Sequence, residues 1–231
     1  LDDGLLKDYD DSLKTFQKEH NLTIFHLMGQ HVNYKLRYRK EQAKFWASSY
    51  EEKRPELTTA QRKMLSHYDN ATLYNDSIVA QIVKRFQKED AVVIYVPDHG
   101  EECYEEDRGF ICRNHSANID WPLAHYEFEI PFWIYCSPKY IRNHRDIYRQ
   151  IRKAKDKRFM TDALPHLLLY LAGIKTPTYK EEYNILSPKY NEMRPRILKN
   201  SADYDQLRDE HLEKVEKEKS KKKKSKKGDK K

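Results

Sequence analysis

The chain has 231 residues and a formal net charge of +7. No run approaches the roughly 18 consecutive apolar residues of a membrane span. Aromatic side chains make up 12% of the sequence, which argues against a disordered protein. These values favour a folded chain long enough to bury a sizeable core.

The positive charge is concentrated at the C-terminus. Residues 214–231 contain 11 lysines and three acidic residues, whereas residues 1–213 carry 33 basic and 34 acidic side chains. The body of the protein is therefore close to neutral, and its composition does not favour a nucleic-acid-binding fold. Cys103, Cys112 and Cys136 allow at most one intrachain disulfide, with Cys103 and Cys112 the nearest pair, which excludes a disulfide-rich scaffold.

The first half of the chain alternates helical and extended patterns. Apolar residues at helical spacing predict a helix over Leu5–Lys18. Leu22–Leu27 is rich in β-branched and aromatic side chains and predicts a buried strand. Residues 35–57 are charged and are expected to be irregular to helical. A T-x-x-Q capping box then predicts a long amphipathic helix from Thr58 to about Lys88.

The second half continues this alternation. Ala91–Val96 is almost free of polar residues and predicts a strand that is buried on both faces of a parallel sheet. Residues 101–121 are polar and expected to be irregular. Ile130–Cys136 predicts another buried strand, and Asp162–Ile174 predicts a helix that ends at Gly173. Strands alternating with long helices indicate an α/β fold with an open, mostly parallel sheet flanked by helices.

The composition changes near residue 200. Residues 1–200 carry the pattern of the folded body. Residues 201–231 are expected to form a charged helix followed, from Lys219, by a disordered lysine-rich tail.

Candidate functional residues follow two of the predicted strands, where ligands collect in open α/β sheets. Asp98 and His99 come directly after Ala91–Val96, and Gly100 permits the turn in which the two side chains can converge. A carboxylate oxygen and an imidazole nitrogen together suit Zn²⁺, although a simple polar turn is the alternative. His31 lies in the exit loop of the earlier strand and is a better candidate for chemistry than His26, for which packing or support of a ligand residue is favoured.

The order of the motifs resembles that of the sulfatase-like phosphoethanolamine transferases, which belong to the alkaline phosphatase superfamily. The matching motifs span roughly residues 1–175 and are H-x-x-G-Q-H at 26–31, Arg37-Tyr38, Y-D-N at 68–70 with Tyr74, D-H-G-E at 98–101, His115, and I-P-x-W at 130–133. The resemblance implies an alkaline phosphatase/sulfatase-like α/β domain. It also implies that this chain is the C-terminal part of that domain and is incomplete at the N-terminus.

The resemblance implies roles for four residues. Asp98 and His99 would be zinc ligands, and His31 and His115 would line the phosphate site or a second metal position. In the family a threonine nucleophile and a further zinc-binding glutamate lie far upstream of these motifs, before Leu1. The catalytic nucleophile is therefore assigned to no residue of this chain, and the chain alone is expected to be inactive.

The implied reaction is zinc-dependent transfer of phosphoethanolamine from phosphatidylethanolamine to lipid A or another envelope acceptor. The implied location is the bacterial inner membrane, with the catalytic domain in the periplasm and N-terminal helices in the bilayer. No nucleic-acid partner is expected.

Two alternatives remain. One is a sulfatase or phosphodiesterase of the same superfamily, which the identity of the nucleophile would distinguish. The other is a catalytically silent envelope or interaction module whose lysine tail binds anionic lipid or nucleic acid, and the salt dependence of that binding would reveal it.

Overall fold

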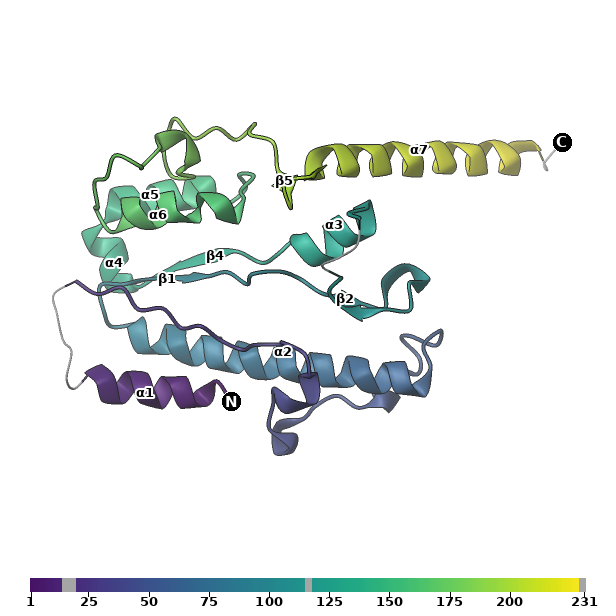
Figure 1. Cartoon of the computed structure of the whole chain (residues 1–231), viewed down its shortest axis with the longest axis horizontal. Helices are drawn as coiled ribbons and strands as arrows, with labels where there is room; N and C mark the ends of the chain where they lie inside the picture. Colours follow the sequence, from purple (N-terminus) through teal and green to yellow (C-terminus); the bar gives the residue numbers. More distant parts are fainter. Residues whose placement is uncertain (14–19, 115–117, 229–231) are drawn as a thin grey trace. The chain divides into compact units, whose positions relative to one another are not determined.

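The computed structural model describes residues 1–13, 20–114 and 118–228 and combines helices with short strands (Figure 1). The α-helices and strands are α1 (Asp3–Leu13), α2 (Thr59–Phe86), β1 (Val92–Tyr95), β2 (Glu102–Cys103), β3 (Ile111–Cys112), α3 (Trp121–Phe128), β4 (Trp133–Cys136), α4 (Pro138–Asn143), α5 (Arg145–Ala154), α6 (Leu164–Leu171), β5 (Ile197–Leu198), β6 (Ala202–Asp203) and α7 (Tyr204–Gly228). Six short 3₁₀ helices are η1 (Tyr34–Leu36), η2 (Lys40–Gln42), η3 (Ala47–Tyr50), η4 (Glu105–Asp107), η5 (Thr161–Ala163) and η6 (Glu181–Tyr183).

The strands of the described residues form three two-stranded sheets, β1 with β4, β2 with β3, and β5 with β6. β1 and β4 confirm the strands predicted from Ala91–Val96 and Ile130–Cys136. The four residues of β1 are only half-buried, whereas burial on both faces was predicted. β5 and β6 are antiparallel, with Leu198 opposite Ala202. The mixture of helices and strands agrees with the predicted α/β class.

The chain divides into two compact units, and α2 dominates the first, which comprises residues 1–93, 103–112 and 137–139. The predicted capping box is present: the Thr58 hydroxyl accepts the Gln61 backbone N–H, and the Gln61 side chain accepts the Thr58 N–H. α1 lies beside α2 (Figure 1) because Leu6 packs with Ile78 and Ile82, all of them buried. The predicted first helix is thus confirmed over its described part, and residues 14–18 of that prediction lie outside the described residues.

The prediction of a buried strand at Leu22–Leu27 is wrong. These residues have no regular secondary structure, and Leu22 and Ile24 are 76% and 78% exposed. Phe25 and Leu27 pack in the same hydrophobic cluster as Leu6, so the segment buries alternate side chains. A β-forming sequence becomes a strand only when a neighbouring strand pairs with its backbone groups. His26 is also exposed, contrary to the predicted packing role.

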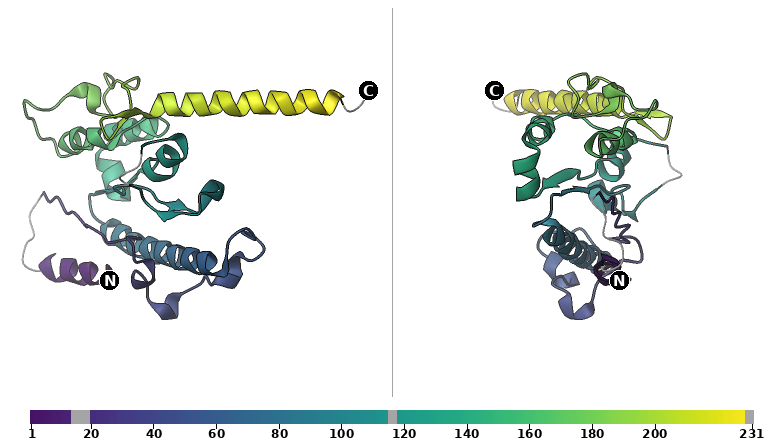
Figure 2. Two further views of the ribbon diagram at one scale, coloured as in Figure 1. Left: turned by 45° about the vertical axis from the view of Figure 1, so that its right-hand side comes forward. Right: turned by 90° about the vertical axis from the view of Figure 1, so that its left-hand side faces the viewer.

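The second unit comprises residues 94–102, 113–136 and 140–231. α5 and α6 lie side by side in it (Figures 1 and 2), and their apolar faces share one hydrophobic cluster. Ile147 and Ile151 of α5 pack there with Leu167 of α6, which is completely buried. α6 confirms most of the predicted Asp162–Ile174 helix, and Gly173, with φ of +67°, follows its end. α3, α4 and α5 were not predicted.

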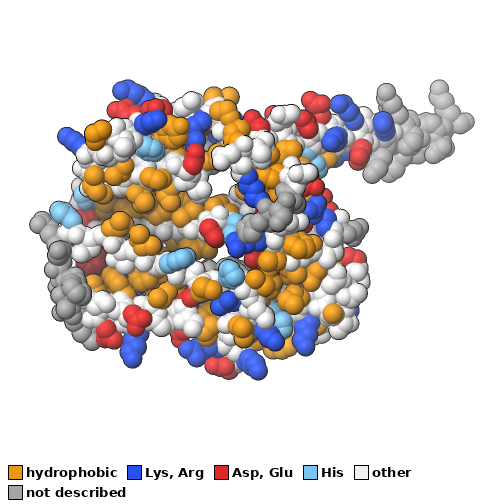
Figure 3. All heavy atoms as spheres, viewed as in Figure 1, with side chains coloured by type: hydrophobic (Ala, Val, Ile, Leu, Met, Phe, Trp, Pro, Cys, Tyr) orange, Lys and Arg blue, Asp and Glu red, His pale blue; other side chains and the backbone are white. Residues whose placement is uncertain are grey.

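α7 packs on α3 through aromatic rings of the second unit. Trp121 stacks on His125 of its own helix and on His211 of α7, with ring centroids 5.3 and 5.2 Å apart. Beyond these contacts α7 extends as a long single helix (Figure 2). Both basic and acidic side chains lie along its described part in Figure 3.

α7 continues through residues 219–228, and the disordered tail predicted from Lys219 stays a prediction. Lysine and glutamate are good helix formers, and i, i+4 pairs such as Glu213 with Lys217, 3.1 Å apart, support the helix. The last three residues of the predicted tail lie outside the described residues.

Candidate metal and phosphate site

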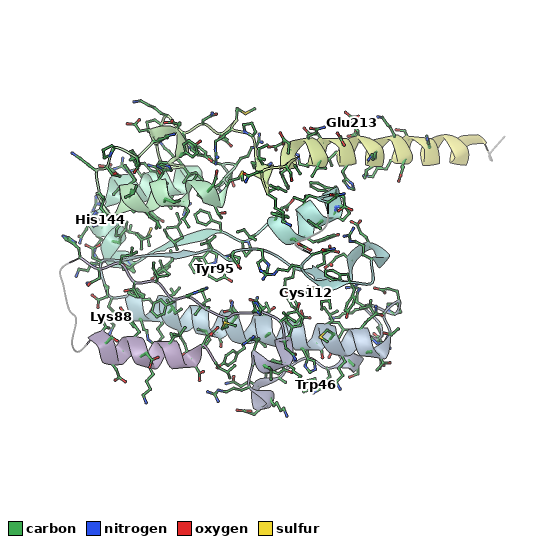
Figure 4. The ribbon with its side chains drawn as sticks, in the orientation of Figure 1. Trp46, Lys88, Tyr95, Cys112, His144 and Glu213 are labelled. Atoms are coloured by element: carbon green, nitrogen blue, oxygen red, sulfur yellow. The ribbon has the colours of Figure 1, made fainter. Side chains whose placement is uncertain are left out.

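The candidate metal ligands lie in a turn that follows β1 within the second unit. Tyr95, at the end of β1, stacks on Trp133 of β4 with ring centroids 5.3 Å apart (Figure 4). The Gly100 N–H then donates to the Glu127 carbonyl of α3 at 2.8 Å. A Cβ atom on Gly100 would lie 2.3 Å from the Tyr126 carbonyl oxygen, so this close approach of the turn to α3 requires glycine.

The structure brings the Asp98 and His99 side chains together. The Asp98 carboxylate accepts the His99 backbone N–H at 3.1 Å and lies 3.6 Å from His99 Nε2. His99 Nδ1 lies 2.6 Å from the Gly100 carbonyl oxygen. Because a carbonyl only accepts, this contact assigns the proton of a neutral imidazole to Nδ1 and the lone pair to Nε2. The pair therefore presents an oxygen and a nitrogen ligand to one small region.

Zinc accepts carboxylate oxygen and imidazole nitrogen as ligands, and a structural or catalytic zinc site usually has three or four protein ligands. No group of three or more His, Cys, Asp or Glu side chains suited to a metal ion occurs in the described part of the chain. Asp98 and His99 are two side chains whose chemistry suits zinc, and their role as metal ligands stays a prediction. Cys103, Cys112 and Cys136 form no disulfide in the described part of the chain.

A buried carboxylate fixes the loop beside this pair. Glu127, on α3, is 3% exposed, and its Oε1 accepts the Asn114 backbone N–H at 2.6 Å. Burial raises the pKa of Glu127, and the hydrogen bond from Asn114 partly opposes that rise. Arg113, immediately before Asn114, contacts His99 Nε2 through its guanidinium. The sequence did not predict a role for Arg113, because no pattern distinguishes a single arginine in a polar loop from a solvated residue.

The roles of the two predicted phosphate-site histidines stay predictions. His31 is exposed and belongs to the first unit, so its meeting with Asp98 and His99 stays a prediction. Its loop is ordered locally: Asp2 accepts the Met28 and Gly29 N–H groups, and Arg37 Nε donates to the His31 carbonyl at 2.7 Å. His115 lies outside the described residues.

The Y-D-N motif has a structural role in the first unit. Asn70 is 3% exposed, and its Oδ1 accepts the N–H groups of Lys44 and Phe45 while its Nδ2 donates to the Phe45 and Ser66 carbonyls. Asp69 accepts a hydrogen bond from Tyr50. The motif thus connects the irregular segment before η3 to α2. The resemblance to a family motif did not predict this structural role.

The comparisons with known proteins agree with this architecture. The C-terminal periplasmic domain of EptC from Escherichia coli, solved in complex with zinc, superposes with a TM-score of 0.72 at 29% identity, over 89% of this chain and 57% of that domain. EptC from E. coli O18:K1:H7, a phosphoethanolamine transferase, is 32% identical over 89% of this chain and 35% of its own length. The Kdo(2)-lipid A phosphoethanolamine 7''-transferase of E. coli K12 is 31% identical over 68% of this chain and 27% of its own length.

The fold is therefore that of the α/β domains of the alkaline phosphatase and sulfatase class. The sulfatase family model matches residues 1–174, and the chain belongs to the sulfatase family. Its relatives in these comparisons are phosphoethanolamine transferases, as the order of the motifs predicted. The chain spans about a third of the length of the first of these relatives. Within the residues that the structure describes, none of the helices combines the length and the apolar character of a bilayer span.

Proposed function

We propose that this chain forms part of the catalytic domain of a zinc-dependent phosphoethanolamine transferase of the bacterial inner membrane, with the domain in the periplasm. The donor would be phosphatidylethanolamine and the acceptor lipid A or another envelope molecule. The observation that carries the proposal is the Asp98–His99 turn, found in a chain that is 32% identical to EptC over 89% of its length. The zinc in the related periplasmic domain supports the choice of metal.

The residues of this chain would contribute binding and orientation. Asp98 and His99 would hold the zinc ion, and the Gly100 carbonyl would keep the His99 ring turned so that Nε2 faces the metal. Bound zinc supplies a Lewis acid that activates a hydroxyl nucleophile and offsets charge on phosphoryl oxygens. His31 and His115 are proposed to line the phosphate site. The family resemblance assigns the nucleophile to a threonine that precedes the matched motifs, so we expect no turnover from this chain alone.

A chimeric enzyme tests the reaction. The matching part of E. coli EptC is replaced by this chain, and lipid A and its sugar core are analysed by mass spectrometry for added phosphoethanolamine. We expect modification by the chimera and none when it carries Asp98→Asn. The matched control is Asp156→Asn, because the Asp156 side chain is 84% exposed and pairs only loosely with Lys155, 3.6 Å away.

Two results of this experiment would contradict the proposal. One is modification that persists at full rate in the Asp98→Asn chimera, which would show that Asp98 is not a zinc ligand. The other is a folded chimera that binds zinc and transfers no phosphoethanolamine, which would show that this chain does not complete a transferase site.

A further inference from the structure

A cationic side chain already lies against the two candidate zinc ligands. Arg113 follows Cys112, the last residue of β3 (labelled in Figure 4), and its guanidinium contacts His99 Nε2. The same Arg113 nitrogen lies 3.9 Å from the Asp98 carboxylate. Arg113, Asp98 and His99 all belong to the second unit. One guanidinium therefore faces both side chains that are proposed to hold the metal.

The contact with His99 uses the lone pair that a metal would need. Nδ1 faces the Gly100 carbonyl, which leaves Nε2 as the acceptor of a neutral ring. A guanidinium has five N–H donors and no acceptor, so Arg113 must donate to Nε2. A single lone pair cannot bind an arginine proton and a metal ion together. Zinc on His99 therefore excludes the observed position of the Arg113 side chain.

The ion pair with Asp98 does not explain why an arginine is placed here. The Asp98 side chain is 87% exposed and 3.9 Å away, and such exposed ion pairs contribute little to stability. The backbone beside Arg113 is held more firmly, because Asn114 donates to the buried Glu127 carboxylate at 2.6 Å. The loop is thus fixed next to the turn, while the long side chain keeps the freedom to change partners.

We propose that Arg113 is a phosphate-binding residue of this site. When a divalent ion binds the Asp98–His99 pair, the Arg113 guanidinium moves from His99 to a phosphoryl oxygen. The inference rests on the proposed function. The Arg113 side chain is 27% exposed in its contact with His99, and a cation that displaces it removes that acceptor, which an anionic partner would replace. The planar fork of arginine matches the oxygens of a phosphoryl group and forms bidentate bonds with them. The site thereby recognises the phosphate of phosphoethanolamine with two cations, one from the metal and one from the chain.

The proposal predicts opposite changes in two affinities of the full chain. Isothermal titration with zinc chloride should show that Arg113→Gln binds zinc about tenfold more tightly than the unmodified chain, because a competing hydrogen bond of an ionised donor is lost. Titration of the zinc-loaded proteins with phosphoethanolamine should show an affinity about tenfold weaker in Arg113→Gln. Arg113→Lys keeps the charge without the fork and should fall between the two in phosphoethanolamine binding.

The control is Arg142→Gln, which changes an exposed arginine of α4 in the same unit and should leave both affinities unchanged. An Arg113→Gln chain whose zinc affinity equals that of the unmodified chain would overturn the inference and leave the proposed function standing. Loss of both affinities together with a lower melting temperature would show a purely structural arginine and would also overturn it. If the unmodified chain fails to bind zinc, the competition between zinc and Arg113 has no basis in this chain and the inference is overturned, whereas the chimera still tests the proposed function.

Discussion

Gly100 sets the geometry of the candidate site, because its backbone approaches α3 more closely than any side chain would permit. Gly100→Ala would place a Cβ 2.3 Å from the Tyr126 carbonyl, and a backbone atom cannot yield as a flexible side chain would. We expect this variant to lose about 1–3 kcal/mol of unfolding free energy and to bind zinc more weakly.

Urea unfolding measures the loss, with Gly4→Ala as the matched control. Gly4 lies in α1 with open space around the position of a Cβ, so this substitution should stabilise the chain by roughly 0.5–1 kcal/mol. Equal stability of Gly100→Ala and the unmodified chain would show that the turn can move away from α3.

Glu129, just beyond α3, is a second residue whose surroundings define a test. Burial would raise the pKa of Glu129, but hydrogen bonds from Tyr204 and His125 outweigh it, so that the pKa lies below its usual 4.5. A depressed carboxyl pKa contributes stability that is present above pH 4.5 and is lost as the pH falls through the lower, folded-state value. Burial, together with the bond to Glu129, raises the pKa of Tyr204 to about 12.

Tyr204→Phe removes the hydroxyl and keeps the aromatic ring. We expect it to destabilise the chain by about 1–2 kcal/mol at pH 7, because an ionised acceptor loses its donor. The difference should shrink as the pH is lowered below 4.5, where Glu129 becomes protonated in the unfolded state and then in the folded one. Denaturant unfolding at a series of pH values provides the measurement. A difference that stays constant down to acid pH would assign the effect to packing alone.

At the residue scale the sequence predicted what depends on neighbours along the chain. Asp98, His99 and Gly100 are consecutive, so their convergence in a turn followed from spacing alone. Arg113, which follows β3, and Glu127 of α3 reach the same turn through tertiary contacts, and no local pattern identified them. The same limit applies to Asn70, whose four backbone partners include the distant residues Lys44 and Phe45.

At the scale of elements, the extended segment Leu22–Leu27 shows how far a propensity can mislead. Its exposed face carries Leu22 and Ile24, whereas Phe25 and Leu27 contact the cluster of α1 and α2. We expect Ile24→Ala to change the unfolding free energy by less than about 0.5 kcal/mol, since a 78% exposed side chain loses little on truncation. Phe25→Ala should cost at least about 2 kcal/mol, because it removes ring contacts with Tyr9 and Phe86.

Thermal and urea unfolding of both variants tests this division between the two faces. Equal losses for Ile24→Ala and Phe25→Ala would mean that the whole segment is buried, as the strand prediction required.

The sequence predicted α2 correctly because the Thr58–Gln61 capping box marks its start locally and helical spacing marks its packing face. α5 escaped prediction because arginines and a lysine flank its two isoleucines, and only the packed structure shows the face that they share.

At the scale of the whole molecule, the net charge of +7 is a property of the C-terminal end. Residues 219–231 contain nine lysines and one aspartate, and their removal would leave the chain at −1. α7 packs on α3 through His211, well before Lys219. We therefore expect deletion of residues 219–231 to leave the melting temperature and the zinc affinity unchanged.

The same deletion should weaken adsorption to anionic vesicles at low salt, because each lysine near such a surface contributes about 1 kcal/mol of attraction. Vesicle co-sedimentation at rising salt provides the measurement, and zwitterionic vesicles are the control. A fall of several degrees in the melting temperature would show that the end of α7 packs on the rest of the chain. Unchanged adsorption would show that these lysines do not contribute to binding at an anionic membrane surface.

The central claim is that Asp98 and His99 hold a zinc ion in this member of the sulfatase family. Crystals of the full chain grown with zinc, measured on both sides of the zinc absorption edge, locate the ion without assuming any ligand. The account predicts an anomalous peak within bonding distance of the Asp98 carboxylate and of His99 Nε2, with Arg113 displaced from that nitrogen. A fully occupied zinc peak that is bound elsewhere, or Asp98 and His99 without a peak at saturating zinc, would contradict it.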